Sequence, residues 1–439
     1  MKVIVVGGGI SGLAAAYTLQ KKGVDAVVLE EKGVPGGRTV GGSQEGFVLD
    51  HGALFFMKCY NATYKLIDEM GLTGDLVPIS YINALWVEGS LVPSNPLKGA
   101  GDLLRAPRAY FSKKRLGLDF YFQVAKLFRT VYSRRETLDF VDCSKAFDLD
   151  GRLFSDYVLE HSGKKALNYL FQPMIAGITL GHADEIGALY GAALFWHLLQ
   201  GNRILKKGLH TLPERLYRKI ESTVLLSTPA ERIVVEHNTV KGVQTQKGFI
   251  DADAVICATT ATAARGLIPN LPASVAGILE KVPYRACCHV VFAYDRPVIP
   301  EGFTSISFPR SAGATMAALA DTARSSEGAA PPGTSLIHCY TYDRYAIEYN
   351  QMTDEDIRAR LKAELKRYFP SMPENPIFSK IYRWQEAMYF ATPGTFGSVH
   401  RLKKENGRPI EGLYFAGDYL NLASVEGAVK SGIDAADLI

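Results

Sequence analysis

The sequence predicts an α/β fold in which a Rossmann-like domain is interleaved with a second, α+β domain. Two observations predict it. A glycine-rich strand–turn–helix pattern opens the chain at residues 2–22, and further strand patterns return at residues 223–258 and 412–418, after two long insertions. The chain has 439 residues, of which 47% are hydrophobic and 21% charged, enough for two or three folded domains with sizeable cores.

The first element is a complete βαβ unit. Lys2–Val6 is a short β-branched run, Leu13–Lys22 has a helical apolar pattern, and Ala26–Leu29 is a second apolar strand with Glu30 at its end. Glu30 can accept hydrogen bonds from both hydroxyls of a ribose and would repel a 2′-phosphate. The unit therefore predicts a site for an adenine dinucleotide that lacks this phosphate.

A glycine-rich turn joins the first strand to the helix. Gly7 permits the tight turn, Gly9 lets the backbone approach a pyrophosphate, and Gly12 allows the helix to pack closely against the strand. Ile10 and Ser11 begin the helix, and a helix N-terminus stabilises bound phosphates. All five residues are therefore expected at the cofactor site.

A second glycine pair follows this unit. Glu31 leads into Pro35-Gly36-Gly37-Arg38, which places a cation where the chain would pass the pyrophosphate again. Together with the later segment Gly46-Phe47-Val48-Leu49-Asp50-His51-Gly52-Ala53, this run resembles the amine oxidase superfamily of FAD proteins, which includes protoporphyrinogen oxidases and carotenoid desaturases. The resemblance implies FAD as the cofactor, bound by a Rossmann-like domain of the GR2 type, with Glu31, Gly37, Arg38, Gly52 and Ala53 at the site.

The resemblance returns near the end of the chain. An apolar strand at 412–416 ends in Gly417 and Asp418, and a helix begins soon afterwards at Val425. In the family the equivalent of Asp418 hydrogen-bonds the ribityl chain, and the backbone at the equivalent of Val425 faces the pyrimidine end of the flavin. In the middle of the chain, the residue after Thr228-Pro229 lies against adenine through its backbone in the family, and here this residue is Ala230.

The predicted domains follow from the places in the chain where these FAD-binding motifs occur. Residues 1–75, 205–270 and 405–439 are expected to form the FAD-binding domain, and residues 76–204 and 271–404 the substrate-binding domain. Residues 76–204 are expected to be mostly helical after a hairpin at 85–93. Single strands are expected at Ile250–Ala258, Cys288–Tyr294 and Thr304–Phe308, and a helix at Asp354–Phe369.

A basic, aromatic-rich stretch at Arg105–Arg135 has two interpretations. It carries nine Lys or Arg residues against one acidic residue. Such a helix can lie on an anionic membrane beside the mouth of an apolar pocket, or it can be a solvated face over core aromatics. Nucleic acid is not an expected partner, because the whole chain has a net charge of only +4 and no recognition fold accompanies the charge.

The reaction is predicted from the resemblance and from what the sequence lacks. The leading hypothesis is an FAD-dependent dehydrogenase or oxidase that desaturates a bulky, largely apolar substrate by hydride transfer to the flavin N5. The alternatives are a flavin amine oxidase, and a non-redox flavoprotein or FAD-dependent isomerase. In an amine oxidase the positions of Ser424 and Ala387 would be aromatic walls and that of His289 a lysine, which argues against simple amines. The electron acceptor stays open between oxygen, a quinone and another carrier.

His289 is the candidate catalytic residue of this sequence. It is the side chain of its apolar strand that normally titrates near neutral pH, so it can relay a proton, and the alternative is a core histidine whose hydrogen bonds are satisfied. No metal site is expected, because the six cysteines lack zinc-ligand spacing. Some amine oxidases bind FAD covalently through a cysteine at a position that would follow Cys339. No cysteine follows Cys339 in this sequence, so the resemblance implies that FAD is noncovalent. Cysteine use and the absence of a long apolar run predict a cytoplasmic protein, in one alternative peripheral on the inner face of a membrane.

Overall fold

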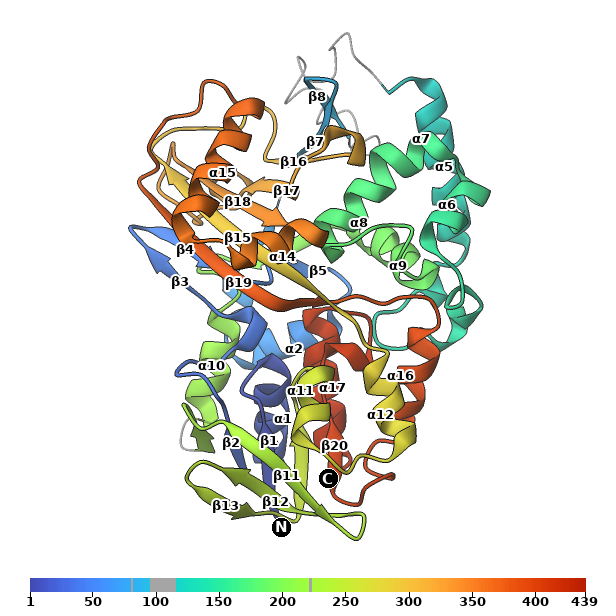
Figure 1. The fold of residues 1–439 in the computed structure, drawn as a ribbon, viewed down its shortest axis with the longest axis vertical. Helices are drawn as coiled ribbons and strands as arrows, with labels where there is room; N and C mark the ends of the chain where they lie inside the picture. The colour runs from blue at the N-terminus through green and yellow to red at the C-terminus, as the bar shows by residue number, and fades with distance from the viewer. Residues whose placement is uncertain (80–81, 95–115, 221–222) are drawn as a thin grey trace.

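A five-stranded parallel sheet forms the base of the molecule. The computed structural model describes residues 1–79, 82–94, 116–220 and 223–439 (Figure 1). The strands of this sheet come from three distant parts of the chain, in the spatial order β10 (Val224–Leu225), β2 (Asp25–Leu29), β1 (Lys2–Val6), β14 (Ala254–Cys257) and β20 (Leu413–Phe415). The predicted α/β fold is confirmed.

Two helices from opposite ends of the chain pack together beside this sheet. They are α1 (Ile10–Lys21) and α17 (Val425–Asp437). A Cβ atom at Gly432 would lie 2.1 Å from the backbone oxygen of Ser11, so the two helices approach at a distance that only glycine allows. The Ser11 hydroxyl lies 3.3 Å from that of Ser431, which also accepts a hydrogen bond from the Gly417 amide.

One predicted strand is wrong. The sequence favoured a single strand over Ile250–Ala258, but the chain bends at residues 252–253 and contributes to two sheets. The first part is the last strand of an antiparallel meander, made of β11 (Ala230–Glu236), β12 (Thr239–Thr245) and β13 (Gly248–Asp251). The second part is β14. The amide of Asp253 donates to the Lys2 oxygen at the point where the chain joins the parallel sheet.

A seven-stranded sheet forms the upper part of the molecule (Figure 1). Its spatial order is β19 (Phe378–Tyr389), β15 (Tyr284–Tyr294), β18 (Ser335–Thr341), β17 (Met316–Asp321), β16 (Ser305–Ser307), β7 (Asn83–Val87) and β8 (Ser90–Pro93). The predicted hairpin is present: β7 and β8 are joined by Glu88 and Gly89, both with positive φ, as a two-residue hairpin requires.

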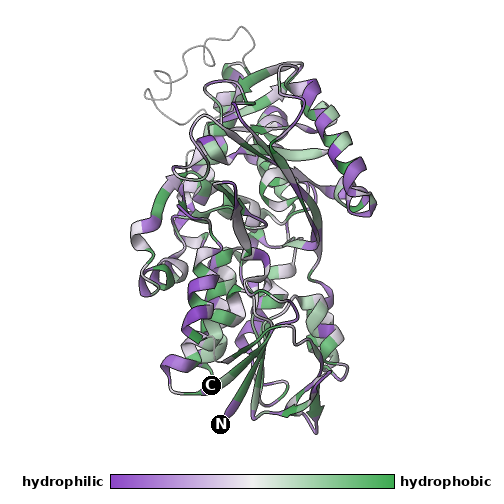
Figure 2. Ribbon diagram, turned by 90° about the vertical axis from the view of Figure 1, so that its left-hand side faces the viewer, coloured by the Kyte–Doolittle hydropathy of each residue, from purple (hydrophilic) through white to green (hydrophobic). Residues whose placement is uncertain are grey.

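Helices cover both sheets. The first insertion supplies α5 (Leu118–Ser133), α6 (Phe154–His161), α7 (Lys164–Ala166), α8 (Gln172–Thr179) and α9 (Ala188–Leu198). The remaining longer helices are α2 (Asn61–Glu69), α10 (Thr211–Ile220), α11 (Ala261–Leu267), α12 (Ala273–Glu280), α14 (Asp343–Gln351), α15 (Asp354–Tyr368) and α16 (Thr395–Lys404). In Figure 2 the strands at the base are largely hydrophobic, in keeping with a sheet that is covered by other elements.

Two small sheets connect the base with the upper part. The hairpin β3 (Gly41–Gln44) and β4 (Phe47–Asp50) is one. The other joins β5 (Phe56–Met57), β9 (Asn202–Leu205) and β6 (Leu76–Ile79). All six cysteines are unpaired, and none of the helices within the described ranges combines the length and apolar character needed to cross a membrane.

Candidate functional site

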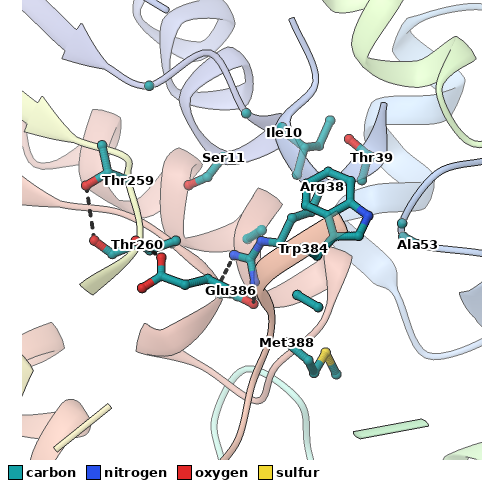
Figure 3. A pocket seen from close by; sticks show the side chains of 18 of the residues that line it. Ile10, Ser11, Arg38, Thr39, Ala53, Thr259, Thr260, Trp384, Glu386 and Met388 are labelled. Carbon is teal, nitrogen blue, oxygen red and sulfur yellow. Dashed lines mark hydrogen bonds and ion pairs between the residues drawn. The ribbon is translucent and has the colours of Figure 1, made fainter. Parts of the chain in front are cut away.

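A cavity of about 990 Å³ runs from the edge of the parallel sheet to the seven-stranded sheet. It is lined by almost every residue that the sequence singled out: Gly7, Gly9, Ile10, Ser11, Glu30, Glu31, Gly37, Arg38, Gly52, Ala53, Ala230, His289, Gly417, Asp418 and Val425. Gly12 lies behind the lining, where a Cβ atom would stand 1.9 Å from the Gly7 oxygen. The structure therefore brings together residues from the first 53 positions, from the middle of the chain and from residues 417–425. Figure 3 labels Ile10, Ser11, Arg38 and Ala53 among the side chains at this cavity.

The two glycine-rich segments face each other at one end of the cavity. The amide of Gly36 donates to the Gly8 oxygen, and a Cβ atom at Gly37 would lie 3.0 Å from the Gly9 Cα. At Gly9 a Cβ atom would meet no atom closer than 3.9 Å, so this position opens into the cavity. The N-terminus of α1 has no side-chain cap, which leaves its first amides for a ligand. This cradle fits a pyrophosphate.

Glu30 is fixed at the end of β2. Its Oε2 accepts a hydrogen bond of 2.6 Å from the Gly8 amide and its Oε1 one of 2.9 Å from the Lys32 amide. Burial raises the pKa of this carboxyl, although the two amides act in the opposite direction. The carboxylate is thus held on the cavity wall, where ribose hydroxyls of a dinucleotide would reach it. Glu31 lies beside it on the exposed rim.

Arg38 and Asp418 form an ion pair that the sequence did not predict. The guanidinium donates two hydrogen bonds, of 3.0 and 2.7 Å, to the two carboxylate oxygens. Burial lowers the pKa of Arg38, but Asp418, Tyr284 and Glu386 together raise it, and the net shift is upward. The sequence assigned the two residues to different parts of FAD, whereas here each also orients the other.

The strand β19 contributes polar groups that sequence reasoning missed. The Thr260 hydroxyl donates to Glu386 at 2.6 Å, and both side chains are labelled in Figure 3. The Trp384 indole donates to the His51 oxygen at 3.0 Å. The available signal was the run Trp384-Gln385-Glu386, in which polar side chains directly precede the apolar run Ala387-Met388-Tyr389. Both contacts join this strand to the wall of the cavity.

His289 belongs to a chain of hydrogen bonds. Its Nδ1 lies 2.9 Å from the His51 oxygen and its Nε2 lies 2.9 Å from Nδ1 of His338, whose Nε2 lies 3.0 Å from the Thr322 hydroxyl. A carbonyl only accepts, so His289 Nδ1 carries the hydrogen; a neutral His289 then accepts from His338, and His338 accepts from Thr322. The His289 ring also stacks on Tyr340, with centroids 4.4 Å apart.

Both ring nitrogens of His289 are therefore used within the protein. Burial lowers the pKa of His289 to about 4, and that of His338 falls well below its usual value for the same reason. His289 lines the cavity, but a neutral ring without a free lone pair is poorly placed to accept a proton from a substrate. The geometry favours a positioning role, in which His289 and Trp384 both donate to the His51 oxygen.

The far end of the cavity is mostly apolar. Ala387 and Ser424 line it, at the two positions where the resemblance would place aromatic walls in an amine oxidase. The Ser424 hydroxyl accepts from the Gly427 amide and caps α17. The remaining lining at this end comes mainly from Leu54, Phe55, Met57, Tyr60, Gly177, Ile178, Leu180, Leu194, Tyr340 and Met388.

Comparison with known proteins agrees with this architecture. The sequence matches the family "Flavin containing amine oxidoreductase" over residues 10–439. It is 21% identical to coproporphyrinogen III oxidase of Bacillus subtilis (strain 168), in an alignment that covers 97% of this chain and 94% of that enzyme. It is 29% identical to the mitochondrial protoporphyrinogen oxidase of Nicotiana tabacum, but over only 45% of this chain and 36% of that enzyme.

The fold also matches a solved structure over its full length. The structure of a putative protoporphyrinogen oxidase from Exiguobacterium sp. 255-15 superimposes with a TM-score of 0.80, covering 100% of this chain and 98% of that one, at 19% identity. The family match spans nearly the whole sequence and ends beyond the last cavity residue. The chain belongs to the flavin-containing amine oxidoreductase family. It is an FAD-dependent oxidoreductase of that family.

Proposed function

We propose that the protein removes hydrogen from a bulky, largely apolar substrate, in the manner of a protoporphyrinogen oxidase or a carotenoid desaturase. The observation that carries the proposal is the continuity of the cavity: the glycine cradle and Glu30 stand at one end, and an apolar lining stands at the other. Charged side chains gather around the cradle and on β19, where Arg383 and Glu386 stand, rather than at the apolar end. An extended hydrocarbon or a macrocycle suits such a lining.

FAD, when bound, supplies the two-electron oxidation. We propose that the chain holds it with the uncapped N-terminus of α1, the Gly9 and Gly37 backbones, the Glu30 carboxylate, the Arg38–Asp418 pair, the Ala230 backbone near adenine and the N-terminus of α17 at Val425. The same proposal assigns residues 1–75, 205–270 and 405–439 to the FAD-binding domain, and residues 76–204 and 271–404 to the substrate-binding domain.

The walls of the cavity orient the substrate and exclude water. Leu180, Leu194 and Met388 supply apolar surface, and Tyr60 and Tyr340 supply flat faces against which a conjugated or macrocyclic molecule can pack. Exclusion of water from this end strengthens every electrostatic contact that remains inside it. The small side chains of Ala387 and Ser424 leave space in the cavity that the aromatic walls of an amine oxidase would fill.

FAD is proposed to be noncovalent. Cys287 lines the cavity, and burial raises the pKa of its thiol well above the usual value. A thiol that stays protonated is a poor nucleophile. Cys339 is buried in β18.

The protein is also proposed to act in the cytoplasm, with α5 against the inner face of a membrane. Residues 105–115 of the predicted basic stretch lie outside the described residues. In α5, the inner face is buried, whereas the outer face exposes Leu118 and Phe122 at 76% and 69%, with Lys126 and Arg129 beside them. Exposed apolar side chains among cations are typical of a helix that lies on an anionic surface.

Anaerobic reduction of the bound flavin tests the substrate class. Protoporphyrinogen IX, coproporphyrinogen III, phytoene and benzylamine are each mixed with the FAD-loaded protein under argon, and the flavin absorbance is followed. Bleaching by a porphyrinogen or by phytoene supports the proposal and separates its two forms. Bleaching by benzylamine alone would assign the protein to the amine oxidases, and no bleaching by any of the four would favour a non-redox or isomerase role.

A further inference from the structure

A second cavity, of about 330 Å³, lies away from the flavin site, between the β3–β4 hairpin and the start of α10. Its charged lining consists of Lys206, Lys207, Arg215, Arg218 and Glu214, with His210 among them. The volume is at the lower end of the range for cavities that hold small molecules.

The cations of this cavity lack acidic partners among the described residues. None of Lys206, Lys207, Arg215 and Arg218 is in an ion pair with an acidic side chain anywhere in residues 1–79, 82–94, 116–220 and 223–439. Four positive side chains thus share the lining with the one carboxylate of Glu214. Their mutual repulsion is relieved by an anion between them.

His210 is a buried member of the lining and is held in one orientation. It is 8% exposed, and its Nδ1 lies 3.2 Å from a carboxylate oxygen of Asp50. Asp50 is 4% exposed, and its other oxygen accepts from the Leu209 amide at 3.1 Å. Because Asp50 takes Nδ1, Nε2 is the ring atom left for the cavity; it lies 4.0 Å from the Glu214 carboxylate, beyond hydrogen-bond distance.

The N-terminus of α10 does not supply the recognition. The Thr211 amide donates to the Gly208 oxygen, the Leu212 amide donates to the Leu209 oxygen, and Pro213 has no amide hydrogen. Side chains therefore have to do the binding. Proteins commonly bind phosphate with arginine guanidinium and lysine ammonium groups that surround one cavity.

We propose that this second cavity binds a small soluble anion that carries a phosphate group. The four cations neutralise the phosphate oxygens. Because the Nδ1 hydrogen of His210 is directed at Asp50, the ring donates to a phosphate oxygen through Nε2 only as the imidazolium. Burial lowers the pKa of His210, but the Asp50 and Glu214 carboxylates raise it, and the net upward shift favours that form. A phosphate monoester carries between one and two negative charges at neutral pH. The four cations of the lining outnumber the single carboxylate and can neutralise this charge. This site is independent of the flavin chemistry proposed above.

Calorimetric titration of the FAD-saturated protein tests the proposal, because FAD then occupies the glycine cradle of the larger cavity and phosphate cannot bind there. The probes are inorganic phosphate and glycerol phosphate, each compared with sodium chloride at equal ionic strength. The double variant Arg215→Gln/Arg218→Gln removes two exposed cations of the lining. The matched control, Lys65→Gln/Lys219→Gln, removes the same charge from exposed positions outside the cavity, one of them on the same helix.

Saturable binding of both phosphate probes, weakened about tenfold or more by the first variant and unchanged in the control, is the expected result. Equal weakening in both variants would show a general effect of net charge and would overturn the site. Absence of binding to the wild type above the chloride baseline would also overturn it. Binding that occurs only to vesicles with anionic phospholipid, and not to free phosphate, would make the surface a membrane contact instead of a small-molecule site.

Discussion

Replacing Gly9 by valine should remove the cofactor without unfolding the protein. The structure predicts this separation because of where the new side chain would go. Gly9 has φ −69° and ψ 173°, which any residue adopts, and its Cβ position is at least 3.9 Å from the nearest protein atom. The added methyl groups therefore enter the open cavity beside Gly9, where the pyrophosphate is expected.

The size of the effect follows from linkage. At an FAD concentration about 100 times the dissociation constant, binding adds about 2.7 kcal/mol to the free energy of unfolding. The variant should lose this increment, while its unfolding free energy without FAD should stay within about 1 kcal/mol of the wild type. Urea unfolding with and without added FAD measures both quantities, and the absorbance at purification reports the bound flavin.

Two other glycines make the experiment specific. Gly12→Ala places a Cβ atom 1.9 Å from the Gly7 oxygen, so it should destabilise the fold itself by about 2 kcal/mol or more. Gly74 is exposed, and a Cβ atom there would meet no atom within 4 Å. Gly74→Val should therefore change neither the bound FAD nor the free energy of unfolding. A Gly9→Val protein that purifies with a full complement of FAD would refute the assignment of this end of the cavity.

Three further predictions concern the cofactor linkage, a buried histidine and the outer face of α5. Acid precipitation of the wild type should release all of the FAD into the supernatant, and yellow colour retained in the pellet would contradict noncovalent binding. Because His289 has a folded-state pKa of about 4 against 6.5 in the unfolded chain, the unfolded state binds more protons between these values and stability falls as the pH drops through this window. On going from pH 7.5 to pH 5, His289 should lower the free energy of unfolding by about 2 kcal/mol. His289→Gln should abolish this loss. Urea unfolding at the two pH values measures it. Phe122→Ser should weaken binding to anionic vesicles about tenfold in a sedimentation assay, whereas Phe249→Ser, which removes an exposed aromatic from β13, should not; equal effects would count against a membrane role for α5.

The grouping of the first glycine turn and Glu30 along one cavity was predictable because the signals are local. Each glycine of the first turn stands at a fixed offset from a strand and a helix, and the position of Glu30 follows from the length of β2. The bend at residues 252–253 was not predictable in the same way. The apolar pattern of 250–258 suits either one strand or two, and the choice depends on hydrogen bonds to Lys2 and Lys241, which are remote in the sequence.

The polar networks were out of reach for the same physical reason. Arg38 meets Asp418, and His289 meets His51 and His338, only after distant elements have been brought together. A sequence shows which of these side chains can donate or accept, but not which partner each one finds. Sequence reasoning therefore predicted separate FAD contacts for Arg38 and Asp418 and missed that the two side chains pair with each other.

The order of the strands in the parallel sheet has a consequence for synthesis of the protein. In the order of synthesis, β20, the Gly417–Asp418 turn and α17 follow long after β1 and β2. Until then α1 lacks the helix that packs across Gly432, and Arg38 lacks its carboxylate. Pairing across such sequence separations is slow. We therefore expect full retention of FAD only after residues 413–437 have joined the sheet, although the first βαβ unit can form as soon as β2 has been made.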